Sequence, residues 1–298
     1  MTFLQAEIAR QPATWRRVAE IALQHATALP ATGERVLAVG CGTSAFMADS
    51  YARLREAAGQ GETDSCPASE FRPGRRYDRL LMISRSGTTT ELIRLVDAVA
   101  GRLPVTALTA VPDSPLAARA SHLIGLPFAD ELSVVQTAFA TTALALLRAS
   151  LGEDVTALAD AAEPVLAAEL PPAWPQAEQI TFLGSGFGYG IACEAALKLR
   201  EAAQFWAESY PSMEYRHGPI SIAGPGRLVW QFGPDAGGLR AEVAATGAGF
   251  VDDDLDPMVD LLRAQRLALA IALSRGLNPD RPRSLSRSVI LAAEPTSE

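Results

Sequence analysis

The residues best suited to chemistry lie in a short segment rich in hydroxyl groups, Ser84 to Thr89. Four apolar residues before it predict a short buried strand, and the apolar spacing after it predicts a helix. A turn of this kind directs backbone N–H groups and hydroxyls at one point, where the dipole of the following helix favours negative charge. The segment therefore predicts a phosphate-binding loop whose charge-assisted hydrogen bonds are worth about 1.5–3 kcal/mol each.

A capping box is the simpler alternative, because Thr88 and Glu91 have the required spacing of three residues. A capping box needs neither the hydroxyls of Ser84 and Ser86 nor Gly87 between them. We favour the anion site and keep the helix start as the alternative.

A second group of candidates is Glu194, Lys198 and Glu201, which share one face of a predicted helix at positions i, i+4 and i+7. Spacing alone favours a solvated charged face, where an ion pair contributes about 0.2–0.5 kcal/mol. His217 lies beside Gly218 in a loop-like segment. Because histidine titrates near neutral pH, it is a candidate for proton transfer, and a plain surface histidine is equally compatible.

The composition restricts the class of protein. The chain has 298 residues, 48% hydrophobic and 20% charged, which suits one large or two ordinary α/β domains. We see no apolar run of membrane-spanning length and no secretory signal near the N-terminus. Three scattered cysteines form no disulfide framework, so we expect a cytoplasmic protein.

Charge and ligand counts argue against two further classes of partner. The net charge is −8 and no Lys/Arg cluster is apparent, so we expect no nucleic-acid partner and no membrane partner. The three histidines and three cysteines are too scattered for a zinc site, and no metal is expected. An acidic protein can still hold phosphate in a local positive pocket.

The elements that must position these residues alternate between strand and helix. We expect a strand at residues 35–40, a glycine turn, and a helix at 45–58. Further strands are expected at 104–110 and 120–126, and an apolar helix at 137–150. This alternation predicts an α/β fold of the three-layer kind, with parallel sheets flanked by helices.

The pattern recurs 144 residues later, which indicates an internal duplication. Apolar residues run into Gly-x-Gly at Gly40/Gly42 and again at Gly184/Gly186. Only the first copy has the hydroxyl-rich loop, so only that half should hold phosphate. The predicted organisation is a helical lead-in (1–34), a first domain (35–151), a helix and linker (152–178), a second domain (179–276) and a C-terminal tail (277–298).

The Gly-x-Gly turns also suggest a dinucleotide site, but neither completes the fingerprint. Ala45 and Tyr189 stand where the third glycine belongs, and no acidic residue is clearly placed after the next strand. We therefore expect no cofactor.

Five motifs occur in order along the chain. They are Cys41–Ser44, Ser84–Thr89, Glu194–Glu201, His217–Pro219 and Asp280–Val289. Together they resemble the sugar isomerase (SIS) domain family, specifically the tandem-SIS isomerase half of glucosamine-6-phosphate synthase. The segment Glu131–Thr137 is most similar to a stand-alone branch that includes AgaS-type ketose/aldose isomerase–deaminases and fructosamine-6-phosphate deglycases.

The resemblance implies two SIS subdomains and assigns binding roles around one pocket. The phosphate-binding loop matches Ser84, Ser86 and Thr89, with Arg85 lining it. Positions that contact the sugar match Thr43, Ser44, Val134 and Gln136. The tail, with Ser286 and Arg287, is expected to close over the site.

The resemblance also implies catalytic roles. Glu201 matches the base that moves a proton between C1 and C2, Lys198 a supporting cation, and His217 the residue that opens the sugar ring. One carboxylate can carry this proton if burial brings its pKa toward neutrality. In the family the histidine loop reaches the neighbouring subunit's pocket, which implies a homodimer.

Departures from the synthase pattern shape the expected activity. The sequence shows no glutaminase domain, so glutamine-dependent amination is not expected. Ala138 replaces one lysine, and Arg287 stands where the synthase's tail lysine can form an imine with the open ketose. Arginine stays protonated and cannot form a Schiff base.

We therefore expect an aldose–ketose isomerase, and a deaminase, that acts on an amino-sugar phosphate or a fructosamine 6-phosphate. The alternative is a non-catalytic sugar-phosphate sensor, because SIS domains also occur in regulators and the tail lysine is missing. The sequence does not identify the sugar.

Overall fold

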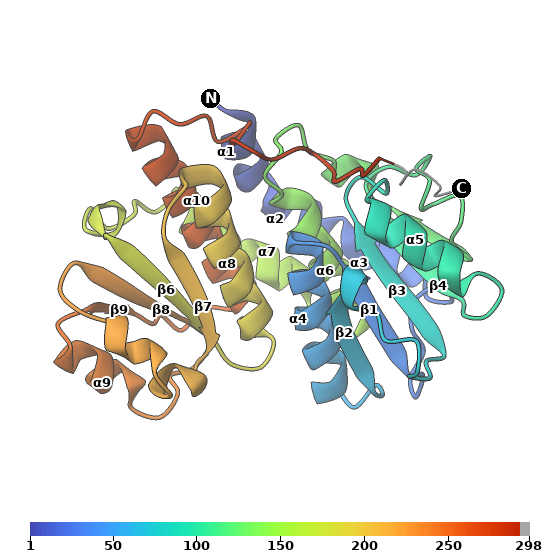
Figure 1. The fold of residues 1–298 in the computed structure, drawn as a ribbon, viewed down its shortest axis with the longest axis horizontal. Helices are drawn as coiled ribbons and strands as arrows, with labels where there is room; N and C mark the ends of the chain where they lie inside the picture. Colours follow the sequence, from blue (N-terminus) through green and yellow to red (C-terminus); the bar gives the residue numbers. More distant parts are fainter. Residues whose placement is uncertain (293–298) are drawn as a thin grey trace, which may run out of the picture.

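Two parallel sheets, one five-stranded and one four-stranded, form the frame of the molecule (Figure 1). The computed structural model describes residues 1–292. The strands are β1 (Val36–Gly40), β2 (Thr63–Pro67), β3 (Arg79–Ser84), β4 (Val105–Thr109) and β5 (His122–Gly125) in the first sheet, and β6 (Gln179–Gly184), β7 (Ala207–Pro211), β8 (Arg227–Phe232) and β9 (Gly249–Val251) in the second.

Helices cover both sheets. They are α1 (Phe3–Ala9), α2 (Gln11–Arg16), α3 (Val18–Gln24), α4 (Thr43–Ala57), α5 (Thr90–Val99), α6 (Ala138–Ser150), α7 (Val155–Ala167), α8 (Gly188–Ala203), α9 (Leu239–Ala245) and α10 (Pro257–Ser274). Several of them, including α4, α6 and α8, lie between the two sheets (Figure 1). One hydrophobic core there joins the first unit, which is the five-stranded sheet with its helices, to the second unit, which is the four-stranded sheet with its helices. α5 and α9 cover the outer faces. The predicted α/β class is confirmed.

The two sheets repeat one connection pattern. Their orders are β2-β1-β3-β4-β5 and β7-β6-β8-β9, and every pairing is parallel. β1, β3 and β4 are buried along their whole length, as expected for parallel strands covered on both faces. The second sheet is one strand shorter than the first.

The glycine turns that follow β1 and β6 are packing requirements. A Cβ on Gly40 would lie 2.3 Å from the Ser44 carbonyl carbon, and one on Gly184 would lie 2.2 Å from the Gly188 carbonyl oxygen. No side chain fits where each strand turns so tightly into its helix. α4 starts at Thr43, two residues earlier than predicted, so the Thr43 hydroxyl lies in the first turn of the helix.

The N-terminal segment, predicted as a helical lead-in, is made of three short helices. They are α1 to α3, and they extend from Phe3 to Gln24. Pro12 lies in the first turn of α2, where a proline starts a helix readily and cannot continue the preceding one.

Two close approaches bring distant parts of the chain together. A Cβ on Gly190 of α8 would lie 2.3 Å from the Ser50 Oγ and 2.5 Å from the Phe46 carbonyl oxygen of α4, so the two helices pack this closely because position 190 has no side chain. After α10 the chain returns across the first unit toward α5 (Figure 1). Asp280 anchors this return because its carboxylate accepts the Phe3 and Leu4 N–H groups.

Candidate functional site

The hydroxyl-rich loop joins β3 to α5 and is held by its own side chains. Ser84 Oγ accepts the Gly87 N–H at 3.0 Å, and Ser86 Oγ accepts the Thr88 N–H at 3.2 Å. Gly87 has a φ of +63°, and a Cβ there would lie 2.0 Å from Ser114 Oγ. The loop therefore needs glycine at this position for both backbone and packing reasons.

The capping-box alternative is not what the structure shows. The N-cap of α5 is Thr89, which makes no side-chain capping bond, and the Thr88 N–H is bonded to Ser86 instead of Glu91. The hydroxyls of this loop are thus not used to cap the helix.

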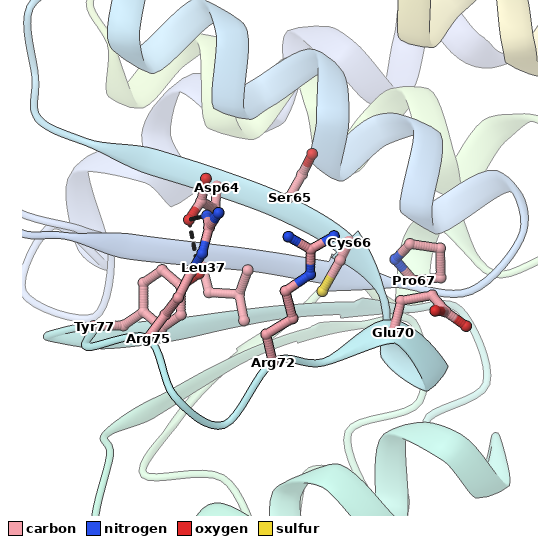
Figure 2. A pocket seen from close by; sticks show the side chains of 9 residues that line it. All are labelled: Leu37, Asp64, Ser65, Cys66, Pro67, Glu70, Arg72, Arg75 and Tyr77. Atoms are coloured by element: carbon pink, nitrogen blue, oxygen red, sulfur yellow. Dashed lines mark hydrogen bonds and ion pairs between the residues drawn. The ribbon is translucent and has the colours of Figure 1, made fainter.

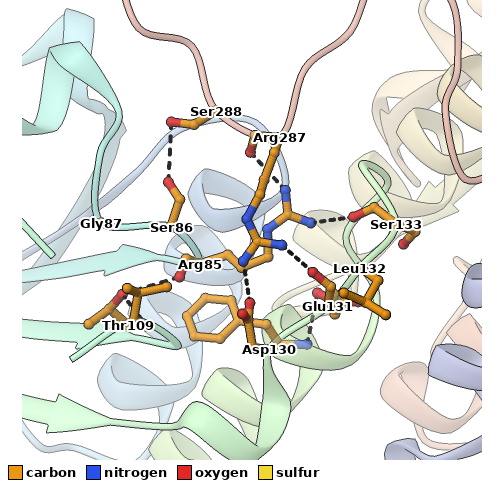
Figure 3. Close-up of polar contacts among 12 residues, drawn as sticks. Arg85, Ser86, Gly87, Thr109, Asp130, Glu131, Leu132, Ser133, Arg287 and Ser288 are labelled. Carbon is orange, nitrogen blue, oxygen red and sulfur yellow. Dashed lines mark hydrogen bonds and ion pairs between the residues drawn. The ribbon is translucent and has the colours of Figure 1, made fainter. Parts of the chain in front are cut away.

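An oxygen atom of the C-terminal tail lies among these hydroxyls. Ser288 Oγ accepts a hydrogen bond from Ser86 Oγ at 3.2 Å (Figure 3). It also accepts one from Thr88 Oγ1 at 2.9 Å and lies 3.3 Å from Thr89 Oγ1. The Thr90 N–H, at the first turn of α5, donates to the Val289 carbonyl at 3.1 Å. The donors expected to hold a phosphate therefore hold two tail oxygens in this structure, an arrangement that the sequence did not predict.

Arg85 fastens the tail to the loop before α6 (Figure 3). Its guanidinium donates to the carbonyls of Ser133 (2.9 Å), Val134 (3.2 Å) and Arg287 (2.7 Å). Burial lowers the pKa of Arg85. Arg287 in turn binds the Glu131 carbonyl and the Asp130 carboxylate. Neither guanidinium donates to the hydroxyls of the 84–89 loop.

Glu131 fixes the start of α6, a role that the sequence analysis did not assign to it. Its buried carboxylate accepts the Thr137 and Ala138 N–H groups, both at 2.7 Å. Burial raises the pKa of Glu131. This carboxylate is structural, because it serves the helix terminus and orders the loop that carries Val134 and Gln136.

The charged face of α8 is buried, contrary to the solvated-face alternative. Lys198 Nζ lies 2.5 Å from Glu201 Oε2, 3.3 Å from Glu194 Oε1 and 3.0 Å from Thr43 Oγ1. The side chains of Lys198 and Glu194 are each 1% exposed, whereas that of Glu201 is 20% exposed. Glu201 is therefore the member of the trio that a ligand can reach.

Burial and ion pairing oppose each other at Glu194 and Lys198. Burial raises the pKa of Glu194 to about 7, against the opposing charge of Lys198. Burial by itself would lower the pKa of Lys198, yet the adjacent Glu194 and Glu201 raise it. Lys198 is thus held as a cation beside Glu201.

A cavity of about 170 Å³ gathers most of the predicted site. The predicted residues that line it are Thr43, Arg85, Thr89, Val134, Gln136, Glu201, Ser286 and Arg287. Ser44, Ser84, Ser86 and Lys198 are buried and do not line it. Lining residues that the sequence analysis did not assign are Cys41, Gly42, Glu91, Leu285, Ser288 and Val289.

His217 does not belong to this cavity within one chain. It is exposed and follows the short 3-10 turn Glu214–Arg216 in the second unit. Its predicted role in ring opening therefore stays a prediction that depends on a second subunit.

A larger cavity of about 450 Å³ lies along β2 (Figure 2). One of its two carboxylates, that of Asp64, already accepts hydrogen bonds from Tyr77 at 2.7 Å and Arg75 at 2.5 Å, and the other belongs to the exposed Glu70. No predicted site residue lines this cavity. We take the smaller cavity as the candidate site because Thr89 of the hydroxyl-rich loop and Glu201 line it together.

Within residues 1–292, no group of three or more histidine, cysteine or acidic residues is arranged to hold a metal ion. In the same residues, no helix is long and apolar enough to cross a membrane.

Comparison with known proteins gives one family and many relatives. Residues 31–150 match the model described as SIS domain. Glutamine–fructose-6-phosphate aminotransferase (isomerizing) from Xanthomonas campestris is 30% identical over 96% of this chain and 58% of its own length. The same-named protein of Methanothermobacter thermautotrophicus is 28% identical over 86% of this chain and 51% of its own length. The chain spans about half the length of these curated relatives.

Solved structures show the same fold. A glucosamine-6-phosphate deaminase from Thermotoga maritima superposes with a TM-score of 0.81 at 24% identity, covering 97% of this chain and 100% of that one. A tagatose-6-phosphate ketose/aldose isomerase from Escherichia coli superposes with a TM-score of 0.79 at 21% identity, covering 100% and 97%.

Proposed function

The chain belongs to the SIS domain family through residues 31–150, and from that premise we propose that it is an aldose–ketose isomerase for a phosphorylated amino sugar or fructosamine. Relatives and fold neighbours named for sugar-phosphate isomerisation and deamination support an enzyme. In this proposal the isomerisation gives an imine, water adds to the imine carbon, and the C–N bond breaks to leave a carbonyl group and release ammonia or another amine.

The phosphate binds at the hydroxyl-rich loop. Ser86 and Thr89 supply hydroxyls, Ser84 holds the loop in shape, and the Thr90 N–H adds a donor at the start of α5. The ester must displace Ser288, whose hydroxyl oxygen has the same partners. Binding at this end positions the sugar carbons without reacting, which is the main use of a remote phosphate in catalysis.

Glu201 is the base. It removes the proton from one of the two adjacent carbons, C1 or C2, and returns it to the other after the double bond has moved, so no proton or electron is lost. Lys198, whose Nζ lies 2.5 Å from Glu201 Oε2, orients this carboxylate. Because Thr43 binds Lys198, the first unit also positions this pair.

Ring opening is assigned to His217 of a second subunit, in a homodimer. The support is the family resemblance of the motif and the exposure of His217 in one chain. Arg287 closes the tail over the site but supplies no amine for an imine, because its guanidinium binds Asp130 and the Glu131 carbonyl.

One observation carries the proposal: α8 of the second unit delivers Glu201 to the cavity that Thr89 of the phosphate loop borders. The test is incubation with glucosamine 6-phosphate and fructosamine 6-phosphate, with assays for ketose and ammonia. Glu201→Gln should bind these sugars and not turn them over. A thermal shift with sugar phosphate and no product from the wild type would instead support the sensor alternative.

A further inference from the structure

Glu91 lines the candidate cavity although the sequence offered it only a role in capping. It lies in the first turn of α5 and borders the cavity together with Thr89 and Glu201. The capping box is not formed, because the Thr88 N–H donates to Ser86 Oγ at 3.2 Å. The half-buried Glu91 side chain therefore needs another explanation.

One carboxylate oxygen of Glu91, Oε2, is buried and has no hydrogen-bond donor in the described residues, 1–292. A buried, unpaired charge is costly, and protein sites normally compensate it with a cation or with donors. An oxygen left in this state beside a cavity indicates that the partner comes from the ligand.

The cations near the cavity are engaged elsewhere. Arg85 donates to the Ser133, Val134 and Arg287 carbonyls. The Arg287 guanidinium binds Asp130, and Lys198 binds Glu201. Among residues 1–292, no lysine or arginine forms an ion pair with Glu91.

Two uncharged residues that line the same cavity, Cys41 and Gln136, supply no cation either. Burial, and then the negative charge of Glu91, raises the pKa of Cys41 to about 11, so the thiol stays neutral. Gln136 presents a second buried oxygen, Oε1, that accepts no hydrogen bond in the described residues. The cavity therefore presents two acceptors without donors.

We propose that Glu91, assisted by Gln136, receives the protonated amine of the ligand, so that the site selects sugar phosphates with an ammonium group over those with a hydroxyl group in its place. This inference rests on the proposed function and narrows its substrate class. The phosphate end of the ligand meets hydroxyl and N–H donors, and the ammonium end meets a carboxylate. A neutral sugar hydroxyl donates a hydrogen bond to Glu91 but does not neutralise its charge.

The test compares two probes that differ in one group, glucosamine 6-phosphate and glucose 6-phosphate. Calorimetric binding is measured on the Glu201→Gln protein, which prevents turnover, with and without Glu91→Gln. In Glu91→Gln, loss of a charge-assisted hydrogen bond should weaken the binding of glucosamine 6-phosphate by about tenfold to a hundredfold in Kd. The Kd for glucose 6-phosphate should change by less than about threefold in the same variant.

The matched control is Glu70→Gln, an exposed glutamate that lines the β2 cavity and should leave both affinities unchanged. A second readout is pH. With Glu91 present, the preference for glucosamine 6-phosphate should fall as its ammonium loses the proton, and with Gln at this position it should not. A merely structural Glu91 would not produce this difference.

The outcomes separate the two claims. If Glu91→Gln loses equal affinity for both sugars, or loses no affinity for the amino sugar, the proposed role of Glu91 is wrong and the isomerase proposal still stands. Failure of the Glu201→Gln protein to bind either phosphosugar would overturn the proposed function, and this inference with it.

Discussion

Replacing Lys198 by methionine probes the buried charges on α8. Methionine is close to the lysine stem in length but cannot neutralise Glu194 at 3.3 Å or Glu201 at 2.5 Å. At an effective dielectric constant of about 20, each of these attractions is on the order of 5–7 kcal/mol, much of which offsets the desolvation of the three groups. Removing the shared cation from a buried cluster should cost about 3–5 kcal/mol of unfolding free energy at pH 7.5.

A double variant identifies the cause of the loss. Lys198→Met combined with Glu194→Gln leaves no unpaired charge at the fully buried position, so it should recover at least about half of the loss. The measurement is urea unfolding followed by circular dichroism. As a control, Arg119→Met breaks the exposed pair between Arg119 and Asp97 and should cost less than about 1 kcal/mol.

Two results would refute this reasoning. One is a loss in Lys198→Met no greater than in the Arg119 control. The other is a double variant no more stable than the single one, which would mean that the uncompensated charge of Glu194 is not what destabilises the protein.

Three further predictions concern the same site. Glu201→Gln should lower kcat by about a hundredfold to ten-thousandfold while the Kd for sugar phosphate, measured by calorimetry, changes little; an unchanged kcat would contradict the assignment. Gly87→Ala should cost roughly 1–3 kcal/mol in urea unfolding and weaken phosphosugar binding, because its Cβ would meet Ser114. Gly101→Ala has a similar φ of +71° but open space around its Cβ, so it should leave binding intact. Burial raises the pKa of Glu194 to about 7 in the folded protein, so its contribution to stability is full below its unfolded pKa of about 4.5 and is lost as pH rises through 7. Urea midpoints from pH 5 to 8 should therefore fall less steeply in Glu194→Gln, and identical slopes would contradict this.

Local signals were sufficient for much of the fold. The strand predicted at residues 35–40 is β1, and the apolar run before the hydroxyl-rich loop is β3, because buried parallel strands read as continuous apolar segments. β2 was not predicted, since Thr63–Pro67 is an edge strand that is only partly buried and has no apolar run. The break of the N-terminal segment into three helices depends on packing that periodicity does not encode.

The site was harder to read because its decisive contacts join distant parts of the chain. Charge spacing on α8 favoured a solvated face, and only the packing of α8 on α4 shows that Lys198 is buried against Thr43. Ser288 meets the hydroxyl loop across about two hundred residues, which no local pattern reports. Glu91 was not predicted as a site residue because its spacing from Thr88 already had a local explanation, the capping box.

The most direct test of the central claim is a crystal structure of the Glu201→Gln protein soaked with glucosamine 6-phosphate. The account predicts phosphate oxygens about 2.6–3.0 Å from the Ser86 and Thr89 hydroxyls, with Ser288 displaced and the C1–C2 edge of the sugar facing residue 201. A phosphate bound instead in the β2 cavity beside Arg75, with Ser288 still among the loop hydroxyls, would contradict it.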